Sequence, residues 1–169
     1  MINIVLFEPE IPGNTGNIMR TAVATNSKLH LIKPLGFRLD EPKVKRSGAN
    51  YIEDCVYQTY ENINEFFKKN KGNYYFFTRY GHKPQTNFNF SDKAQNIYLI
   101  FGKESTGIPV DILKPHLNNC IRLPMTDKVR ALNLSNTVAI AVYEVLRQQN
   151  YSDLLLDEPH KSKRFIEDN

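Results

Sequence analysis

Short apolar runs alternate along this chain with segments in which apolar residues recur every three or four positions. The apolar runs predict buried strands, and the periodic segments predict helices. The expected strands lie at residues 2–7, 29–33, 55–57, 74–78, 97–101 and 121–123. The expected helices lie at residues 14–26, 60–69, 109–113 and 133–149. This alternation predicts an α/β fold in which βαβ units build a single-domain parallel sheet around one core.

Polar residues and turn signals predict the remaining parts of the chain. Asn14 or Thr15 is expected to cap the first helix, and residues 34–54 are expected to form a basic loop. The apolar face of the last helix consists of Leu134, Val138, Ala141, Val142 and Val145. The chain beyond this helix is less regular, so we expect one domain over residues 1–151 and a C-terminal tail over residues 152–169.

Composition narrows the class of protein. A chain of 169 residues that is 41% hydrophobic and 24% charged is typical of one globular domain. No apolar run approaches the roughly 18 residues that span a bilayer, and the N-terminus does not read as a signal peptide. Cys55 and Cys120 lack metal-ligand spacing, so we expect two buried thiols in a cytoplasmic protein that binds no metal.

Three polar loops rich in glycine and asparagine stand beside expected strands, at residues 14–20, 101–109 and 123–135. Ligands of open parallel sheets bind beyond the carboxyl ends of the strands, so these loops are expected to meet at one cofactor site. For any one loop, the alternative is that glycine and asparagine only shape a turn. The sequence contains no G-x-G-x-x-G, P-loop, H-E-x-x-H or nucleophile elbow, so we expect a different binding scheme.

The three motifs resemble, in order and spacing, those of the SPOUT (trefoil-knot) RNA methyltransferases. They are most similar to the minimal group that methylates the 2′-hydroxyl of the wobble nucleotide of tRNA, cytidine or uridine at position 34. The resemblance covers residues 1–151 and is most specific at residues 3–12 and in the Arg-x-Leu-Asn-Leu-Ser-Asn sequence of residues 130–136. It implies a C-terminal trefoil knot, S-adenosylmethionine as methyl donor, a homodimer, and the tRNA anticodon stem-loop as partner.

The resemblance also implies roles for single residues. It places Asn14 and Arg20 beside the target ribose with Glu104 nearby, and Asn133 is a further catalytic candidate. Around the cofactor it places Phe77, Thr78, Gly102, Leu123, Met125, Ala131 and Leu132. Ala131 stands where many members have serine. Cofactor binding is preserved if that serine contributes only its backbone, whereas affinity or rate suffers if its hydroxyl matters.

Arg20 follows Asn14 by six residues, so both are expected to project toward one ligand from the loop and the first helical turns. The family account makes this arginine the base. Deprotonating an arginine with a pKa near 13 costs about 8 kcal/mol at pH 7. We therefore expect Arg20 to hold the RNA phosphate as a fork and to stabilise developing negative charge. A salt bridge on the helix surface is the alternative.

Three other candidates have structural alternatives. Glu104 is equally expected to accept hydrogen bonds from backbone amides of its own loop, and Asn133 is equally expected to cap the last helix. Tyr143 lies off the apolar face of that helix. There the resemblance implies a dimer interface, and the alternative is an ordinary half-buried tyrosine.

The net charge of +4 is a weak indication of an anionic partner, and the positions of the basic residues say more. Basic and aromatic residues gather at Lys33, Phe37, Arg38, Lys43, Lys45, Arg46 and Tyr51. Clustered cations bind phosphates and exposed aromatic rings stack on unpaired bases, so Lys43, Lys45 and Arg46 are the RNA-binding candidates. A solvated loop is the alternative. A weaker cluster consists of Lys161, Lys163 and Arg164.

The predicted function is transfer of a methyl group from S-adenosylmethionine to the ribose 2′-hydroxyl of the wobble nucleotide of tRNA. One alternative is a non-catalytic RNA-binding module with the same fold, which the intact cofactor motifs disfavour. The other is a family enzyme that acts on a ribose of ribosomal RNA. The lack of an appended RNA-binding domain favours tRNA over that substrate.

Overall fold

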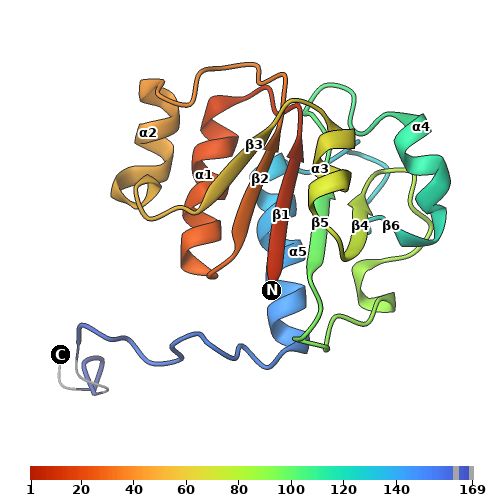
Figure 1. Ribbon diagram of the computed structural model, residues 1–169. Coiled ribbons are helices and arrows are strands. Elements are labelled where there is room, and N and C mark those ends of the chain that lie inside the picture. The colour runs from red at the N-terminus through yellow and green to blue at the C-terminus, as the bar shows by residue number, and fades with distance from the viewer. Residues whose placement is uncertain (162–163, 168–169) are drawn as a thin grey trace.

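The computed structural model describes residues 1–161 and 164–167 and contains a sheet of six parallel strands (Figure 1). The strands are β1 (Ile2–Phe7), β2 (Lys28–Ile32), β3 (Tyr57–Tyr60), β4 (Asn73–Phe77), β5 (Ile97–Phe101) and β6 (Cys120–Ile121). The α-helices are α1 (Pro12–Ala24), α2 (Pro42–Gly48), α3 (Ile63–Lys69), α4 (Val110–Leu113) and α5 (Leu134–Gln148). The 3-10 turns are η1 (Ala49–Ile52), η2 (Gln85–Asn87) and η3 (Lys114–Asn119). The predicted α/β class and parallel sheet are confirmed, whereas the trefoil knot stays a prediction.

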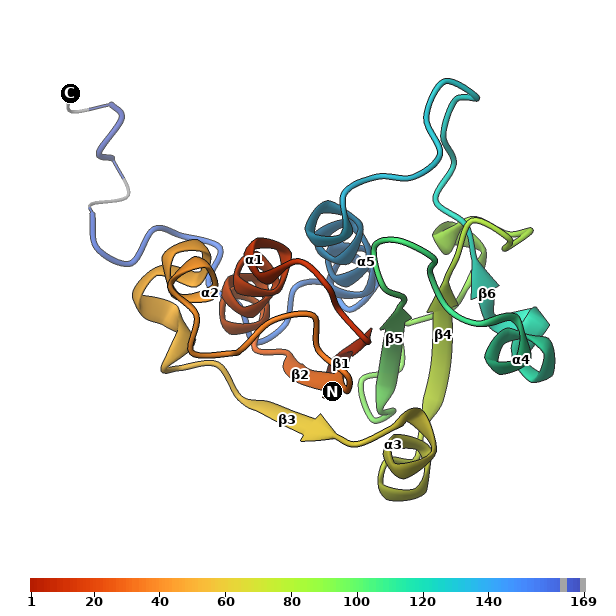
Figure 2. The same cartoon turned by 90° about the horizontal axis from the view of Figure 1, so that it is seen from above.

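The strand order β3-β2-β1-β5-β4-β6 puts β1 and β5 in the middle of the sheet, where both are buried along their whole lengths. Alternate residues of β1 point to opposite faces. Ile4 and Leu6 join the core with α1, α2 and α5, while Val5 and Phe7 join the core with α3. Figure 2 shows these helices on the two sides of the sheet. Because the strands are parallel, the loops after β1, β4, β5 and β6 leave from the same edge.

The start of α1 differs from the sequence prediction. Asn14 and Thr15 lie inside this helix, which begins at Pro12, so the prediction that one of them caps it is wrong. Proline suits the first turn because the N–H that it lacks would have no partner there. The helix has no side-chain cap of its own, and the backbone N–H of Ile11 donates to Glu104 Oε1 at 3.3 Å. A carboxylate distant in sequence therefore takes the place of a local cap.

The segment predicted as one basic loop contains a helix, α2, followed by the 3-10 turn η1. Val44 is the only apolar side chain of α2 that is buried, so the sequence of this segment shows no apolar residues at helical spacing. The helix is held by its packing on α1. A Cβ on Gly16 would lie 2.5 Å from the carbonyl oxygen of Val44, a distance that real side chains do not tolerate. Glycine at this position lets the backbones of α1 and α2 approach each other, and this contact stabilises α2.

The third strand also lies later than predicted, at Tyr57–Tyr60 instead of residues 55–57. It is an edge strand of which only Tyr60 is buried, so no apolar run marks its position. Cys55 and Cys120 are free thiols and are both buried, as predicted. Burial raises the pKa of Cys55 to about 11, so this thiol is protonated at neutral pH. Among the described residues, no helix is long and apolar enough to cross a membrane.

A buried polar network lies on the α3 side of the sheet. His30 is 1% exposed and bonds to Asn3 Oδ1 through Nε2 at 3.1 Å and to the Tyr60 hydroxyl through Nδ1 at 2.8 Å. The amide nitrogen of Asn3 already donates to the carbonyl oxygen of Ile97, so its oxygen accepts from His30. Nε2 of the His30 ring therefore carries a proton. Burial, reinforced by Lys28, lowers the pKa of His30 from 6.5 to about 4.

This network makes stability depend on pH. Below pH 6.5 the unfolded chain takes up a proton at His30, while the folded chain takes it up only near pH 4. Stability is therefore full above pH 6.5 and is expected to fall by about 2 kcal/mol on lowering the pH from 6.5 to 5. Urea unfolding of His30→Gln should lose this slope, and His82→Gln, an exposed histidine, should retain it. Equal slopes in both variants would contradict the assignment.

Candidate active site

A cavity of about 750 Å³ opens at the carboxyl ends of β4, β5 and β6. All the residues predicted to bind the cofactor line it: Phe77, Thr78, Gly102, Leu123, Met125, Ala131 and Leu132. Asn14, Glu104 and Asn133 line the same cavity, so three of the four catalytic candidates are gathered there. Phe77 stacks on Phe101 with ring centres 4.8 Å apart and gives the cavity an apolar wall. The second and third loops singled out in the sequence thus meet at one place. The first segment, residues 14–20, is not a loop but part of α1, and only its Asn14 lines the cavity.

Three of the candidate side chains form a chain of hydrogen bonds. Asn14 Nδ2 donates to Glu104 Oε1 at 2.9 Å, and Asn133 Nδ2 donates to Asn14 Oδ1 at 2.9 Å. Asn133 also caps α5, because its Oδ1 accepts from the backbone N–H of Ser135. The capping role and the place in the cavity therefore hold together. Asn14 is 6% exposed and fixed from both sides, so its amide has one orientation.

Glu104 links two loops rather than bracing its own. Its Oε2 accepts from the backbone N–H of Glu10 at 2.8 Å, and its Oε1 accepts from that of Ile11 and from Asn14 Nδ2. The alternative that it binds amides of its own loop is therefore wrong. The amides belong to the β1–α1 loop, where they precede the helix and attract an anion. Three donors hold this carboxylate in place.

The same two loops are also joined by residues that the sequence did not point to, and here the carboxylates belong to the loop after β1 and the donors to the loop after β5. The Glu10 carboxylate accepts from the Ser105 backbone N–H at 2.9 Å and from Ser105 Oγ at 2.8 Å, and these hydrogen bonds hold its pKa below the usual value. Lys103 Nζ lies 2.7 Å from Glu8 Oε2 in a partly buried ion pair. The partners are about 95 residues apart, so neither spacing nor periodicity signals them.

Gly102 is required by the loop itself. A Cβ at this position would lie 2.2 Å from the backbone carbon of Gly107 and 2.4 Å from the backbone nitrogen of Ile108. Gly107 has a φ of +76°, a conformation that side chains disfavour. A larger residue at Gly102 would therefore displace the whole 102–108 turn as well as narrow the cavity. Ala131, which is exposed and lines the cavity, is a cleaner position at which to block it.

We expect Ala131→Trp to weaken binding of S-adenosylmethionine at least tenfold, or by about 1.4 kcal/mol, because the indole ring takes up space in the cavity. The matched control is Val129→Trp, which adds the same ring to the same loop at a position outside the cavity lining. Titration calorimetry of both variants measures the difference. Undiminished affinity in Ala131→Trp would remove the assignment of this cavity to the cofactor.

Arg20 does not line the cavity. Because α1 begins at Pro12, Asn14 and Arg20 are both helical, and six residues separate them by about 9 Å along the axis and about 120° around it. Arg20 is exposed, and its guanidinium lies 5.4 Å from the centre of the Tyr51 ring. Within one chain, Arg20 therefore lies outside the cavity that Asn14 lines.

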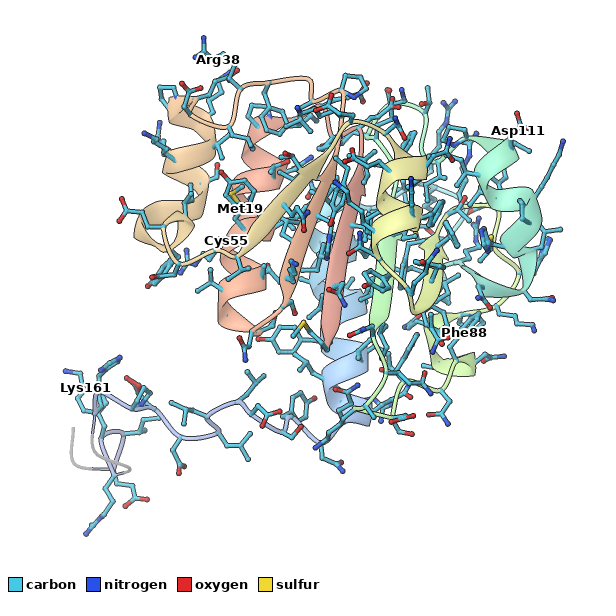
Figure 3. All side chains as sticks on the ribbon, viewed as in Figure 1. Met19, Arg38, Cys55, Phe88, Asp111 and Lys161 are labelled. Atoms are coloured by element: carbon cyan, nitrogen blue, oxygen red, sulfur yellow. The ribbon has the colours of Figure 1, made fainter. Side chains whose placement is uncertain are left out.

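The basic candidates divide into paired and unpaired residues. Lys43, Lys45 and Arg46 lie exposed on α2. Lys33 pairs with Glu61, and Arg38 pairs with Asp40 and points to solvent (Figure 3). Phe37 packs against the core, whereas Tyr51 is exposed and its ring also lies beside the Arg20 guanidinium. In the weaker cluster, Lys161 lies on the tail and Lys163 is outside the described residues. Among residues 1–161 and 164–167, no group of three or more His, Cys, Asp or Glu side chains is arranged for a metal ion.

Comparison with known proteins identifies the family. Residues 1–143 match the family model described as the SpoU rRNA methylase family. The chain belongs to this family. The predicted resemblance to RNA methyltransferases is thereby confirmed.

Individual relatives are similar over nearly their whole lengths. A tRNA (cytidine(34)-2′-O)-methyltransferase of Saccharophagus degradans is 39% identical over 163 residues, 90% of this chain and 98% of its own. A Bacillus subtilis protein provisionally named for the same activity is 48% identical over 154 residues, with coverages of 90% and 96%. A structure described as concerning 2-OH methylation of C/U34 on tRNA is 36% identical, has a TM-score of 0.83, and covers 89% of this chain and 97% of its own.

Proposed function

We propose that this chain transfers a methyl group from S-adenosylmethionine to the ribose 2′-hydroxyl of nucleotide 34, cytidine or uridine, in tRNA. The observation that carries the proposal is the cavity in which the Glu104–Asn14–Asn133 hydrogen-bond chain meets the predicted cofactor residues. Relatives named for this activity support the choice of substrate. We propose that residues 1–151 form the catalytic domain, that residues 152–169 form a tail, and that the enzyme works in the cytoplasm.

The cavity fits the methyl donor. Its volume of about 750 Å³ lies within the range of small-molecule sites, which combine apolar walls with a few placed polar groups. Phe77 and Leu123 give apolar surface, and residues 130–134 of the last loop form a further part of the lining. When bound, S-adenosylmethionine supplies an electrophilic methyl group. The protein then has to place the 2′-hydroxyl in line with that methyl group and prevent other orientations of the ribose.

The side chains in the cavity suit orientation more than proton transfer. Glu104 already accepts from three N–H donors, so it serves to hold Asn14 and the β1–α1 loop. Arg20, in our proposal, binds an RNA phosphate as a bidentate fork and stabilises the negative charge that develops on the 2′-oxygen as the hydroxyl proton passes to water. The basic residues of α2, Lys43, Lys45 and Arg46, bind further phosphates of the anticodon stem-loop.

We propose a two-fold homodimer in which Arg20 of one copy completes the cavity of the other. Two observations support this arrangement: Arg20 is exposed and lies outside the cavity of its own chain, and α5 exposes apolar surface at Ile140 and Tyr143. The second observation gives the dimer an apolar contact surface. A non-catalytic RNA-binding module is disfavoured, because such a module needs no cavity of this size lined by the cofactor motifs.

Methylation of synthetic anticodon stem-loops tests the function. Mass spectrometry of the nucleosides should show 2′-O-methylcytidine or 2′-O-methyluridine from position 34, and a stem-loop with 2′-deoxyribose at that position should gain no methyl group. Incorporation into the deoxy substrate would place the methyl group elsewhere. Methylation of ribosomal RNA fragments in preference to the stem-loop would support the ribosomal alternative.

A further inference from the structure

An arginine–tyrosine pair at the rim of the cavity has no role in the function proposed above. Arg79 and Tyr80 follow β4 and line the cavity next to Phe77 and Thr78. The Arg79 guanidinium carbon lies 4.8 Å from the centre of the Tyr80 ring, and its Nη2 donates to the Tyr80 hydroxyl at 2.5 Å. The Tyr80 side chain is 55% exposed, so much of its ring is open to solvent. The two side chains contact each other and are also accessible to a ligand.

The turn that carries the pair is fixed against β6. The backbone N–H of Thr78 donates to the Ile121 carbonyl at 2.9 Å, and that of Arg122 donates to the Lys83 carbonyl at 3.0 Å. A Cβ on Gly81 would lie 2.6 Å from the backbone carbon of Ile121, so only glycine permits this approach. The pair is thus presented by a preorganised turn, which lowers the entropy lost when a ligand binds.

The same rim concentrates positive charge. Arg79, Arg122 and Arg130 all line the cavity, and Arg122 Nη1 donates to the Arg79 carbonyl at 2.5 Å. Within the described part of the chain, none of the three forms an ion pair with a carboxylate. Lys103, on the neighbouring loop, is by contrast paired with Glu8. Unpaired arginines beside an exposed ring indicate an anionic ligand that also has a flat face.

We propose that Arg79 and Tyr80, with Arg122 beside them, bind the RNA strand next to the methylated nucleotide. Arg79 and Arg122 hold a backbone phosphate and Tyr80 stacks on an unpaired base, the combination by which proteins bind single-stranded nucleic acid. This inference rests on the proposed function. The carboxylate of the methyl donor would account for an arginine but leaves the exposed ring without a partner.

The rim site is distinct from the basic helix α2. The sheet order puts β4 and β6 at one side and β2 and β3 at the other, and α2 lies on the β3 side (Figure 2). An RNA loop whose target nucleotide enters the cavity is therefore held on both sides of that nucleotide. Two separated contacts fix its direction as well as its affinity.

The test measures binding of a fluorescent anticodon stem-loop to the full-length protein at several salt concentrations. Tyr80→Ala should weaken binding roughly tenfold through lost stacking, while Tyr80→Phe should bind like the wild type. Arg79→Gln should lower the slope of log K against log salt by about one. The matched control is Lys93→Gln, an exposed residue that precedes the amino end of β5, at the opposite edge of the sheet. Calorimetry should show unchanged cofactor affinity in all four variants.

Wild-type RNA affinity in both Tyr80→Ala and Arg79→Gln would overturn the proposal. Lost cofactor binding with intact RNA binding would also overturn it, because the arginines would then serve the methyl donor. Failure of the proposed function appears separately, as RNA binding by the wild type without methyl transfer, and the variant comparison still decides the role of the rim. A wild-type protein that binds no stem-loop would remove both.

Discussion

Arg20→Lys is expected to lower the rate of methyl transfer by one to three orders of magnitude, the typical loss for one electrostatic donor. Lysine keeps the positive charge but loses the planar fork that binds a phosphate in two places. Affinity for S-adenosylmethionine should barely change, since Arg20 lies outside the cavity of its own chain and, in the proposed dimer, binds the RNA phosphate at the partner's cavity. Thermal melting should also stay close to wild type, because Arg20 is exposed and its one ring contact is with Tyr51.

The pH dependence of this variant separates two mechanisms. If Arg20 binds phosphate and supports charge, the pH–rate profile of Arg20→Lys keeps the wild-type shape, because no titrating base has been exchanged. If Arg20 is the base, the lower pKa of lysine shifts the profile clearly toward lower pH. Such a shift would overturn our assignment. Wild-type activity in Arg20→Ala would exclude both roles.

The sequence predicts best those elements whose signal is local. The strand Ile97–Phe101 is an unbroken apolar run and is found at the predicted residues. Helix α5 has a complete apolar face, and its predicted bounds are right to within one residue at each end. Helix α2 has one buried apolar residue, Val44, and its formation depends on the glycine of another helix. No local pattern predicts such a helix.

The candidate site shows the same division. The meeting of the loops follows from topology, because parallel strands bring their carboxyl ends together. The residues that line the cavity follow from the resemblance to the RNA methyltransferases. The bonds from Glu104 to Ile11 and Asn14 join segments some 90 residues apart and become visible only in three dimensions. The separation of Arg20 from Asn14 within one chain is also hidden in the sequence. A spacing of six residues means proximity in a loop but separation in a helix, and α1 begins two residues before Asn14.

The position of Arg20 leads to a test whose two outcomes are recovery of activity or no recovery. At a cofactor concentration too low to fill the Ala131→Trp cavity, we expect a mixture of the two impaired variants Arg20→Ala and Ala131→Trp to recover activity when their subunits exchange. A mixed dimer contains one intact cavity, from the Arg20→Ala chain, and one intact Arg20, from its partner. Half of the dimers in an equal mixture are mixed and each has one complete site, so about a quarter of wild-type activity should return.

The matched control combines the wild type with the double variant Arg20→Ala/Ala131→Trp. If Arg20 acts on the partner's cavity, mixed dimers of this pair contain no complete site, and activity per wild-type chain falls by about half. If Arg20 acts within its own chain, every wild-type chain stays active, and the two single variants do not rescue each other. That second pattern would refute the shared site, and so would a protein that sediments as a monomer and is fully active. Arg20 would then act within its own chain, although it does not line the cavity there.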